Sequence, residues 1–311
     1  MDTNRQILAT FTEDTMPTLD VAVLGALEML ADTEIPALAV GGMGTPLVIG
    51  SGNALATGRF LFARTRAFFA SESVYEERLA QNREHITSAV VISASGGKHA
   101  VGIVETLAAQ GIETWLFTNN PAAPARERVA DDHVLVFPKN REPYTYNTST
   151  YMSMLKALSG EDTESIFHFI EREVNSSIPD FSRYDSFYFI VPPQFATIRE
   201  MLLAKFDELF GARVSARVFS LEETKHAKTL VPSDRECFIA LGEENDLFGD
   251  EKNRVFLPLP ADAGPVAFMA VSYFVIGQIQ KQHPAYYMEN IRAYTLRASE
   301  IFGQTISPIV E

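Results

Sequence analysis

The stretch Ala89–Lys98 reads AVVISASGGK. It opens with a β-branched apolar run, which predicts a buried strand. A turn of serines and glycines follows, and then the segment His99–Gln110, which has the pattern of a helix and stops before Gly111. A strand that passes through a glycine-rich turn into a helix is the repeating unit of a parallel α/β sheet.

The same order of apolar run, turn and helix recurs on both sides of this stretch. Upstream, Pro46–Gly50 is apolar and meets a glycine-rich turn, and Phe60–Phe69 is expected to be helical. Downstream, strands are expected at Thr114–Thr118 and Val134–Phe137. Strands and helices that alternate at these lengths predict a parallel sheet with helices on both faces.

The pattern starts again after the polar, helical segment Ser159–Tyr184. Four strands and two helices are expected there: Ser186–Val191, Ala216–Phe219, Cys237–Leu241 and Arg254–Leu257, with helices at Ala196–Phe210 and Pro265–Lys281. The two halves share an order of elements but not their residues. We therefore predict an α/β protein with two domains in tandem, each a parallel sheet flanked by helices on both faces.

The length of 311 residues suits two domains of ordinary size. The expected boundaries are a helical lead-in at 1–39, a first domain at 40–160, a helical linker at 161–184, a second domain at 185–285, and a C-terminal helix and tail at 286–311.

Composition narrows the possible partners and the compartment. A net charge of −14 argues against nucleic acid, which needs a basic surface. The single cysteine, Cys237, forms no internal disulfide and is expected to be a small buried residue in a strand. The N-terminus lacks the pattern of a signal peptide, and Ala263–Ile279 is expected to be a buried core helix rather than a membrane span. We expect a cytoplasmic protein that binds neither nucleic acid nor membrane.

The turn at Ser93–Lys98 has the chemistry of an anion site. Hydroxyls, glycine amides and a helix N-terminus converge there, which is how a phosphate is held without a metal. Lys98 adds a point charge. The alternative is a helix N-cap with ordinary serines.

A second glycine-rich turn, Gly50–Ala54, lets the backbone approach a ligand. A dinucleotide fingerprint requires a small residue where Leu55 stands, so that pattern fails. Glu72 lies about where a ribose-binding acid would fall, which keeps a nucleotide-dependent enzyme as an alternative.

The order of these pieces resembles the tandem SIS (sugar isomerase) family, which includes the isomerase half of glucosamine-6-phosphate synthase and related phosphosugar isomerases, deaminases and deglycases. The resemblance covers roughly residues 40–280. In this family a strand and glycine turn, like Leu47–Asn53, precede a strand that ends in a Ser-x-Ser-Gly-x-Thr phosphate loop. Ser93, Ser95 and Gly96 match this loop, whereas Lys98 stands where the Thr belongs.

The resemblance implies that the first domain binds a phosphorylated sugar. The family has a Glu followed by a Ser/Thr-rich segment that leads into a helix, and Glu142–Ser149 is similar to it, the alternative being a polar loop. The binding residues implied are Gly52, Asn53, Ser93, Ser95, Gly96, Gly97, Lys98, Glu142 and Thr148.

The family's second domain carries a Lys-x-x-Glu pair and then Glu-x-Lys-His, which Lys205–Glu208 and Glu223–His226 resemble. The family's Gly-Pro after the histidine is Ala227-Lys228 here. The catalytic residues implied are Lys205, Glu208 and His226.

Aldose–ketose isomerisation accounts for these residue types. Glu208 is the candidate for moving a proton between C2 and C1 through an enediol, and His226 for opening the ring near neutral pH. Lys205 orients Glu208 or stabilises developing negative charge. The alternatives are a solvated surface pair for Lys205 and Glu208 and an exposed loop position for His226.

The expected function is therefore conversion of a sugar phosphate by an isomerase, or by a deaminase or deglycase of an amino-sugar phosphate. The alternative is a non-catalytic sugar-phosphate-binding regulatory protein, which has no need of Glu208. No cofactor is expected, and no histidine spacing suggests a metal site. The resemblance implies a homodimer in which His226 serves the partner's site.

Overall fold

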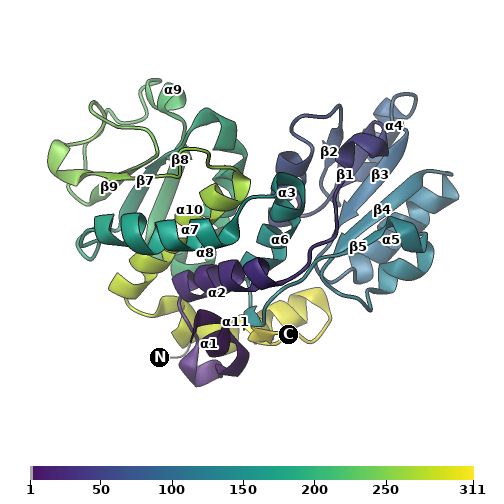
Figure 1. The fold of residues 1–311 in the computed structure, drawn as a ribbon, viewed down its shortest axis with the longest axis horizontal. Coiled ribbons are helices and arrows are strands. Elements are labelled where there is room, and N and C mark those ends of the chain that lie inside the picture. Colours follow the sequence, from purple (N-terminus) through teal and green to yellow (C-terminus); the bar gives the residue numbers. More distant parts are fainter. Residues whose placement is uncertain (1–2) are drawn as a thin grey trace. The chain divides into compact units, whose positions relative to one another are not determined.

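The computed structural model describes residues 3–311, apart from the side chain of Lys98. The chain forms two compact units (Figure 1). Unit 1 contains the chain up to Asp32 together with Asn140–Ser149 and Glu161–Glu311, and unit 2 contains Thr33–Lys139 and Thr150–Gly160.

Unit 2 is built around a five-stranded parallel sheet with the strand order β2-β1-β3-β4-β5. Its strands are β1 (Pro46–Ile49), β2 (Phe68–Ala70), β3 (Ser88–Ile92), β4 (Glu113–Thr118) and β5 (Val134–Val136). Its helices are α3 (Asn53–Leu61), α4 (Tyr75–Asn82), α5 (Lys98–Ala109) and α6 (Thr148–Ser159), of which the first two residues belong to unit 1.

Both faces of this sheet are buried under helices. On one face, strand residues pack with α4 and α5 in a core that includes Leu47, Ile49, Val91, Leu79, Val104 and Leu107. On the other face, α3 approaches so closely that a Cβ on Gly58 would lie 2.6 Å from a methyl of Val48 and 3.1 Å from one of Ile92. Strands covered on both faces read as continuous apolar runs, as β1 and β3 do.

The helix predicted at Phe60–Phe69 is wrong. Helix α3 begins at Asn53, directly after the glycine turn, and ends at Leu61, whereas Phe68–Ala70 forms strand β2. Phe68 and Phe69 pair with Leu47 and Val48 of β1. Aromatic residues suit either structure, and this pairing with a distant strand decides the outcome.

Unit 1 contains a four-stranded parallel sheet with the order β10-β9-β7-β8. Its strands are β7 (Ser186–Ile190), β8 (Ser215–Phe219), β9 (Glu236–Leu241) and β10 (Arg254–Leu257). Its helices are α1 (Asn4–Thr10), α2 (Leu19–Asp32), α7 (Thr163–Phe169), α8 (Arg199–Phe210), α9 (Leu221–Thr224), α10 (Pro265–Gln282) and α11 (Tyr286–Phe302). Beginning at β8, the strands follow the same order as the first four strands of the sheet in unit 2.

The two faces of the sheet in unit 1 are covered differently. Phe187 and Phe189 pack against Phe206 of α8, with ring centroids 5.8 and 5.7 Å apart. On the other face, a small core around Tyr188 is closed by residues that include Leu221 of the single-turn helix α9 and the loop residue Phe248.

Helices α2 and α10 pack with their backbones in close approach. A Cβ on Gly277 of α10 would lie 2.2 Å from the backbone nitrogen of Asp20. Asp20 is buried, pairs with Lys281 and accepts a hydrogen bond from Thr18 Oγ1 at 2.6 Å. The burial of α10 confirms the core helix expected around Ala263–Ile279, and no helix in residues 3–311 is long and apolar enough to span a membrane.

The segment Asn140–Ser149 is held in unit 1 by the end of the chain. Its short strand β6 (Glu142–Pro143) pairs antiparallel with β11 (Ile309–Val310). The Tyr144 amide adds a hydrogen bond to the Pro308 carbonyl at 2.8 Å. This two-stranded ribbon fixes the loop that follows β6.

Candidate functional site

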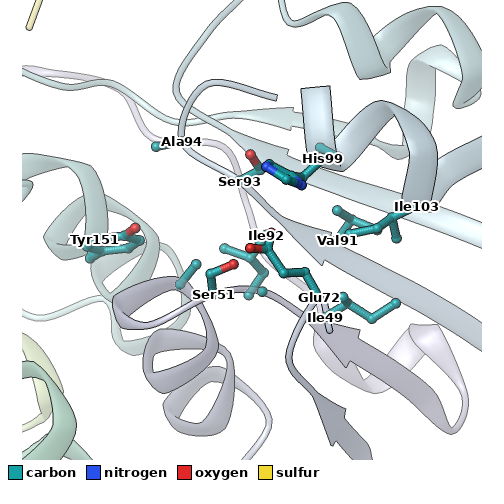
Figure 2. Close-up of a pocket in the computed structure, with 13 residues that line it drawn as sticks. Ile49, Ser51, Glu72, Val91, Ile92, Ser93, Ala94, His99, Ile103 and Tyr151 are labelled. Atoms are coloured by element: carbon teal, nitrogen blue, oxygen red, sulfur yellow. The ribbon is translucent and has the colours of Figure 1, made fainter. Parts of the chain in front are cut away.

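A pocket of about 140 Å³ lies in unit 2 where β1 and β3 end (Figure 2). In the strand order 2-1-3-4-5, the connections from the two neighbouring strands β1 and β3 diverge, which leaves a crevice at their carboxyl ends. Gly50 and Ser51 line the pocket after β1, and Ser93 and Ala94 line it after β3. The fold therefore places both predicted turns beside one cavity.

The remaining polar residues of this pocket come from three other elements. Figure 2 shows the side chains of Glu72, His99 and Tyr151 around it. Glu72 follows β2, His99 lies in the first turn of α5, and Tyr151 lies in α6. The sequence points to Glu72 only as a ribose-binding acid, and neither His99 nor Tyr151 was predicted at a site. Of these two residues, only His99 could have been found from the sequence, because it lies in the first helical turn after the Ser93–Gly97 loop.

The phosphate loop predicted at Ser93–Gly97 is closed by its own serines. Ser93 Oγ accepts from the Gly96 amide and Ser95 Oγ from the Gly97 amide, each at 3.2 Å. Gly96 has a φ of 58°, and a Cβ there would lie 2.4 Å from the Cβ of Ala123, so the position requires glycine.

Neither serine caps α5, whose N-cap residue is Gly97 and has no side-chain cap. The alternative of an ordinary serine N-cap is therefore wrong. The first amides of α5 have no side-chain acceptor at the N-cap, which suits an anion. The side chain of Lys98, predicted to bind phosphate, lies outside the described part of the structure.

The other two residues predicted in this region begin helix α3. Gly52 is its N-cap, with a φ of 49°, and Asn53 is its first residue. Neither lines the pocket, whereas Gly50, Ser51 and Ala54 of the same turn do.

Glu142 lies in unit 1 and is buried, so the segment that follows it is more than a polar loop. Its carboxylate accepts from the amides of Thr148 and Ser149, both at 2.7 Å, and from Ser149 Oγ at 2.5 Å. Burial raises the pKa of Glu142, while the hydrogen bonds from Ser149 and Thr148 and the charge of Lys205 oppose that rise. Glu142 thus caps the start of α6 and shapes the loop before it.

Lys205 and Glu208 form an ion pair on α8 in which the lysine is buried and the glutamate is partly exposed. Lys205 is fully buried, and its ammonium donates to Glu208 Oε2 and to the Thr145 carbonyl. The alternative of a solvated surface pair is therefore wrong. A buried ammonium requires such partners, and the Glu208 side chain remains 24% exposed.

The loop between Glu142 and Thr148 has a strained backbone. Thr145 has a φ of 75° and Asn147 a φ of 49°. A positive φ is rare for a β-branched residue, and such strain persists where the surroundings enforce it, often at functional sites. Here the strained conformation turns the Thr145 carbonyl toward Lys205.

His226 lies on the surface of unit 1, just beyond α9. In the described part of the chain, no hydrogen bond or ion pair joins its imidazole to Lys205 or Glu208. Glu223 closes a capping box with Ser220 and pairs with Arg199, and the hydrogen bond from Arg199 lowers its pKa. Glu223 therefore anchors the segment before His226.

Among residues 3–311, leaving the Lys98 side chain aside, no group of three or more His, Cys, Asp or Glu side chains is placed to hold a metal ion.

Comparison with solved structures gives the fold. The structure superposes on the C-terminal domain of glucosamine-fructose-6-phosphate aminotransferase from Francisella tularensis with a TM-score of 0.63 and 14% sequence identity. The match covers 87% of this chain and 99% of that chain. Tagatose-6-phosphate ketose/aldose isomerase from Escherichia coli gives a TM-score of 0.55 at 15% identity, covering 86% of this chain and 88% of that chain. Glucosamine-6-phosphate deaminase from Thermotoga maritima gives a TM-score of 0.58 at 14% identity, covering 85% of this chain and 92% of that chain.

No protein-family model matches the chain, and no curated protein matches it in sequence. At these identities the structural likeness concerns the fold. The chain is a mixed α/β protein of the SIS-type fold, with parallel sheets flanked by helices.

Proposed function

We propose that this chain converts a phosphorylated sugar through ring opening and an enediol-type intermediate. The reaction is an aldose–ketose isomerisation, or the deamination or deglycation of an amino-sugar phosphate. The observation that carries the proposal is the pairing of the buried Lys205 with the partly exposed Glu208. A carboxylate held in this way is oriented and still reachable by substrate, as proton transfer at carbon requires.

The phosphate-binding residues in this proposal belong to unit 2. Ser93, Ser95, Gly96 and Gly97 form the loop in front of α5, and Lys98 begins that helix. The uncapped amides of α5 support an anion at this position. The solved structures of similar fold include enzymes named for hexose phosphates, which supports the same ligand class.

We also propose two SIS domains in tandem, at 40–160 and 185–285, in a cytoplasmic homodimer. The shared strand order of the two sheets supports the repetition. The exposed position of His226 suits a role in the partner's site. Mixed dimers of Glu208→Ala and His226→Ala chains test this arrangement, because a shared site regains activity in the mixture and separate sites do not.

Proton NMR in D2O tests the proposed reaction. The chain is incubated with a panel of pentose, hexose and amino-sugar phosphates, beside a Glu208→Gln variant. Deuterium entering C1 or C2 of one compound, and absent with the variant, is the expected result. Binding of a sugar phosphate by calorimetry without any exchange would contradict it.

That outcome is the one expected of the second candidate, a sugar-phosphate-binding regulatory protein. This candidate is favoured by the departures from the family pattern, since Lys98 stands in place of a Thr and Ala227-Lys228 in place of a Gly-Pro. A regulatory protein would bind the sugar phosphate equally well with Glu208→Gln, since it needs no proton transfer.

A further inference from the structure

Two tyrosines stand near Glu208 and have no place in the roles assigned so far. Tyr144 follows strand β6, and Tyr294 lies on α11, the helix that packs against α8, which carries Glu208. Their ring centroids are 6.0 Å apart. Tyr144 directly precedes Thr145, whose carbonyl accepts from the Lys205 ammonium that also donates to Glu208. Two segments distant in sequence thus bring phenol rings together in the neighbourhood of the ion pair.

A third tyrosine, Tyr287 of α11, ties this helix to the backbone of Tyr144. Tyr287 is buried, and its hydroxyl donates to the backbone carbonyl of Tyr144. Its ring packs on Tyr146, with centroids 5.5 Å apart. Helix α11 is therefore tied to the same loop whose Thr145 carbonyl receives the Lys205 ammonium.

The hydroxyls of Tyr144 and Tyr294 differ from that of Tyr287 in one respect. Within residues 3–311, neither makes a hydrogen bond or ion pair through its hydroxyl. Tyr144 is half-buried and Tyr294 is 46% exposed, so both are reachable by a ligand. Phenols that are fixed in place and unpaired are ready to donate to a ligand oxygen.

Their electrostatic surroundings keep these hydroxyls protonated. Burial raises the pKa of Tyr144, and the neighbouring Tyr294 and Glu208 raise it further. Burial and then the charge of Glu208 raise the pKa of Tyr294. Both groups are therefore hydrogen-bond donors at neutral pH, close enough to Glu208 to respond to its charge.

We propose that Tyr144 and Tyr294 donate hydrogen bonds to the substrate oxygen that becomes negative when Glu208 removes a proton from the neighbouring carbon. This inference rests on the proposed function. Donors aimed at a developing oxyanion stabilise the transition state more than the ground state.

An aldose phosphate reacts in its open-chain form. The Glu208 carboxylate takes the proton from C2, the electron pair of the broken C–H bond forms the C1–C2 double bond, and the carbonyl electrons pass to O1. Glu208 then returns the proton to C1, and the O2 hydroxyl proton moves to O1, which leaves the ketose. Tyr144 and Tyr294 hold O1 while it carries charge and exchange no atoms.

The test compares Tyr144→Phe and Tyr294→Phe with Tyr286→Phe. Tyr286 also lies on α11, but its ring packs under the guanidinium of Arg213 at 5.3 Å. Each substitution removes one oxygen and keeps the ring. With the sugar phosphate that exchanges deuterium, we expect kcat to fall about 10- to 100-fold in the first two variants, with KM within about twofold. Tyr286→Phe should match the wild type.

The outcomes separate the two ideas. Deuterium exchange by the wild type with unchanged kcat in Tyr144→Phe and Tyr294→Phe would overturn the tyrosine role and leave the proposed function standing. No exchange by the wild type overturns both.

The placement of the phenols has its own measurement. In ¹³Cζ-tyrosine NMR, assigned with the phenylalanine variants, Glu208→Gln should lower the pKa of both tyrosines because a nearby negative charge is removed. Unchanged titrations would overturn the inference whatever the activity.

Discussion

Lys205 and Glu208 share an ion pair in which only the carboxylate reaches water. The Lys205 side chain is fully buried, whereas that of Glu208 is 24% exposed. Lys205 also holds the Thr145 carbonyl, so the strained loop and the pair depend on the same ammonium. The two partners should therefore respond differently to substitution.

Glu208→Leu leaves a buried ammonium without its counter-charge, and we expect a loss of about 3–5 kcal/mol in the free energy of unfolding. Lys205→Met removes the buried charge and lets Glu208 take up water. We expect it to lose at most about 2 kcal/mol, because the Thr145 carbonyl loses its donor and the buried Glu142 loses a nearby positive charge. Urea denaturation of both variants measures the difference. Equal losses, or a larger loss for Lys205→Met, would show that the burial of Lys205 does not decide the outcome.

Replacing both Ser95 and Lys98 by alanine should weaken binding of a sugar phosphate about tenfold or more, because charge-assisted hydrogen bonds to the phosphate are lost. Binding of the same sugar without its phosphate should not change. Calorimetric titration with both sugars checks this. Thr106→Ala is the control, since Thr106 lies on the same helix and bonds the Gly102 carbonyl at 2.9 Å. A similar loss for both sugars would remove the phosphate role of this loop.

Two glycines in helix interiors should respond in opposite ways to alanine. Gly277→Ala places a Cβ 2.2 Å from the Asp20 backbone nitrogen, which must force α2 and α10 apart and should cost about 1–3 kcal/mol of stability. Gly102 has nothing within 4 Å of its Cβ position. Gly102→Ala should therefore stabilise the chain by about 0.4–1 kcal/mol through the unfolded state. Thermal melts of the two variants show whether each is more or less stable than the wild type. A Gly277→Ala variant as stable as the wild type would refute the close approach of the helices.

His283 should make the protein less stable in acid. Burial lowers its pKa, and its Nε2 is buried without a hydrogen-bond partner among the described residues. Below its ordinary pKa of about 6.5, the unfolded state binds the proton more readily than the folded state. The stability contributed by neutral His283 is thus present above that pH and decreases as the pH falls. The free energy of unfolding of wild type relative to His283→Leu should decrease from pH 7 to pH 5. Parallel pH profiles would contradict this.

Cys237 should not react in the folded protein. It is fully buried in β9, and burial raises the pKa of its thiol to about 12. Because the thiolate is the reactive form, a disulfide reagent at pH 8 should label the chain only after unfolding in urea. Rapid labelling of the native protein would show that this part of the sheet opens.

The parallel sheets and the buried helix α10 were predictable because each rests on a local pattern. The β-branched run of β3 and the glycine turn behind it make strand, turn and helix follow one another wherever they occur. Strand β2 was missed because Phe68–Ala70 becomes a strand only by pairing with β1. The lining of the pocket by Glu72 and Tyr151 was beyond sequence reasoning for the same reason, since both reach it from other elements.

The sequence by itself determined the α/β class, the glycine-rich turns and the residue types beside them, because glycine conformations and strand propensities belong to single segments. Only the tertiary structure decided that Lys205 is buried and that Tyr144 and Tyr294 stand near its partner Glu208. It also assigned Asn140–Ser149 to unit 1, although residues on both sides belong to unit 2. Burial and proximity arise when distant segments pack, and no pattern within one segment contains them.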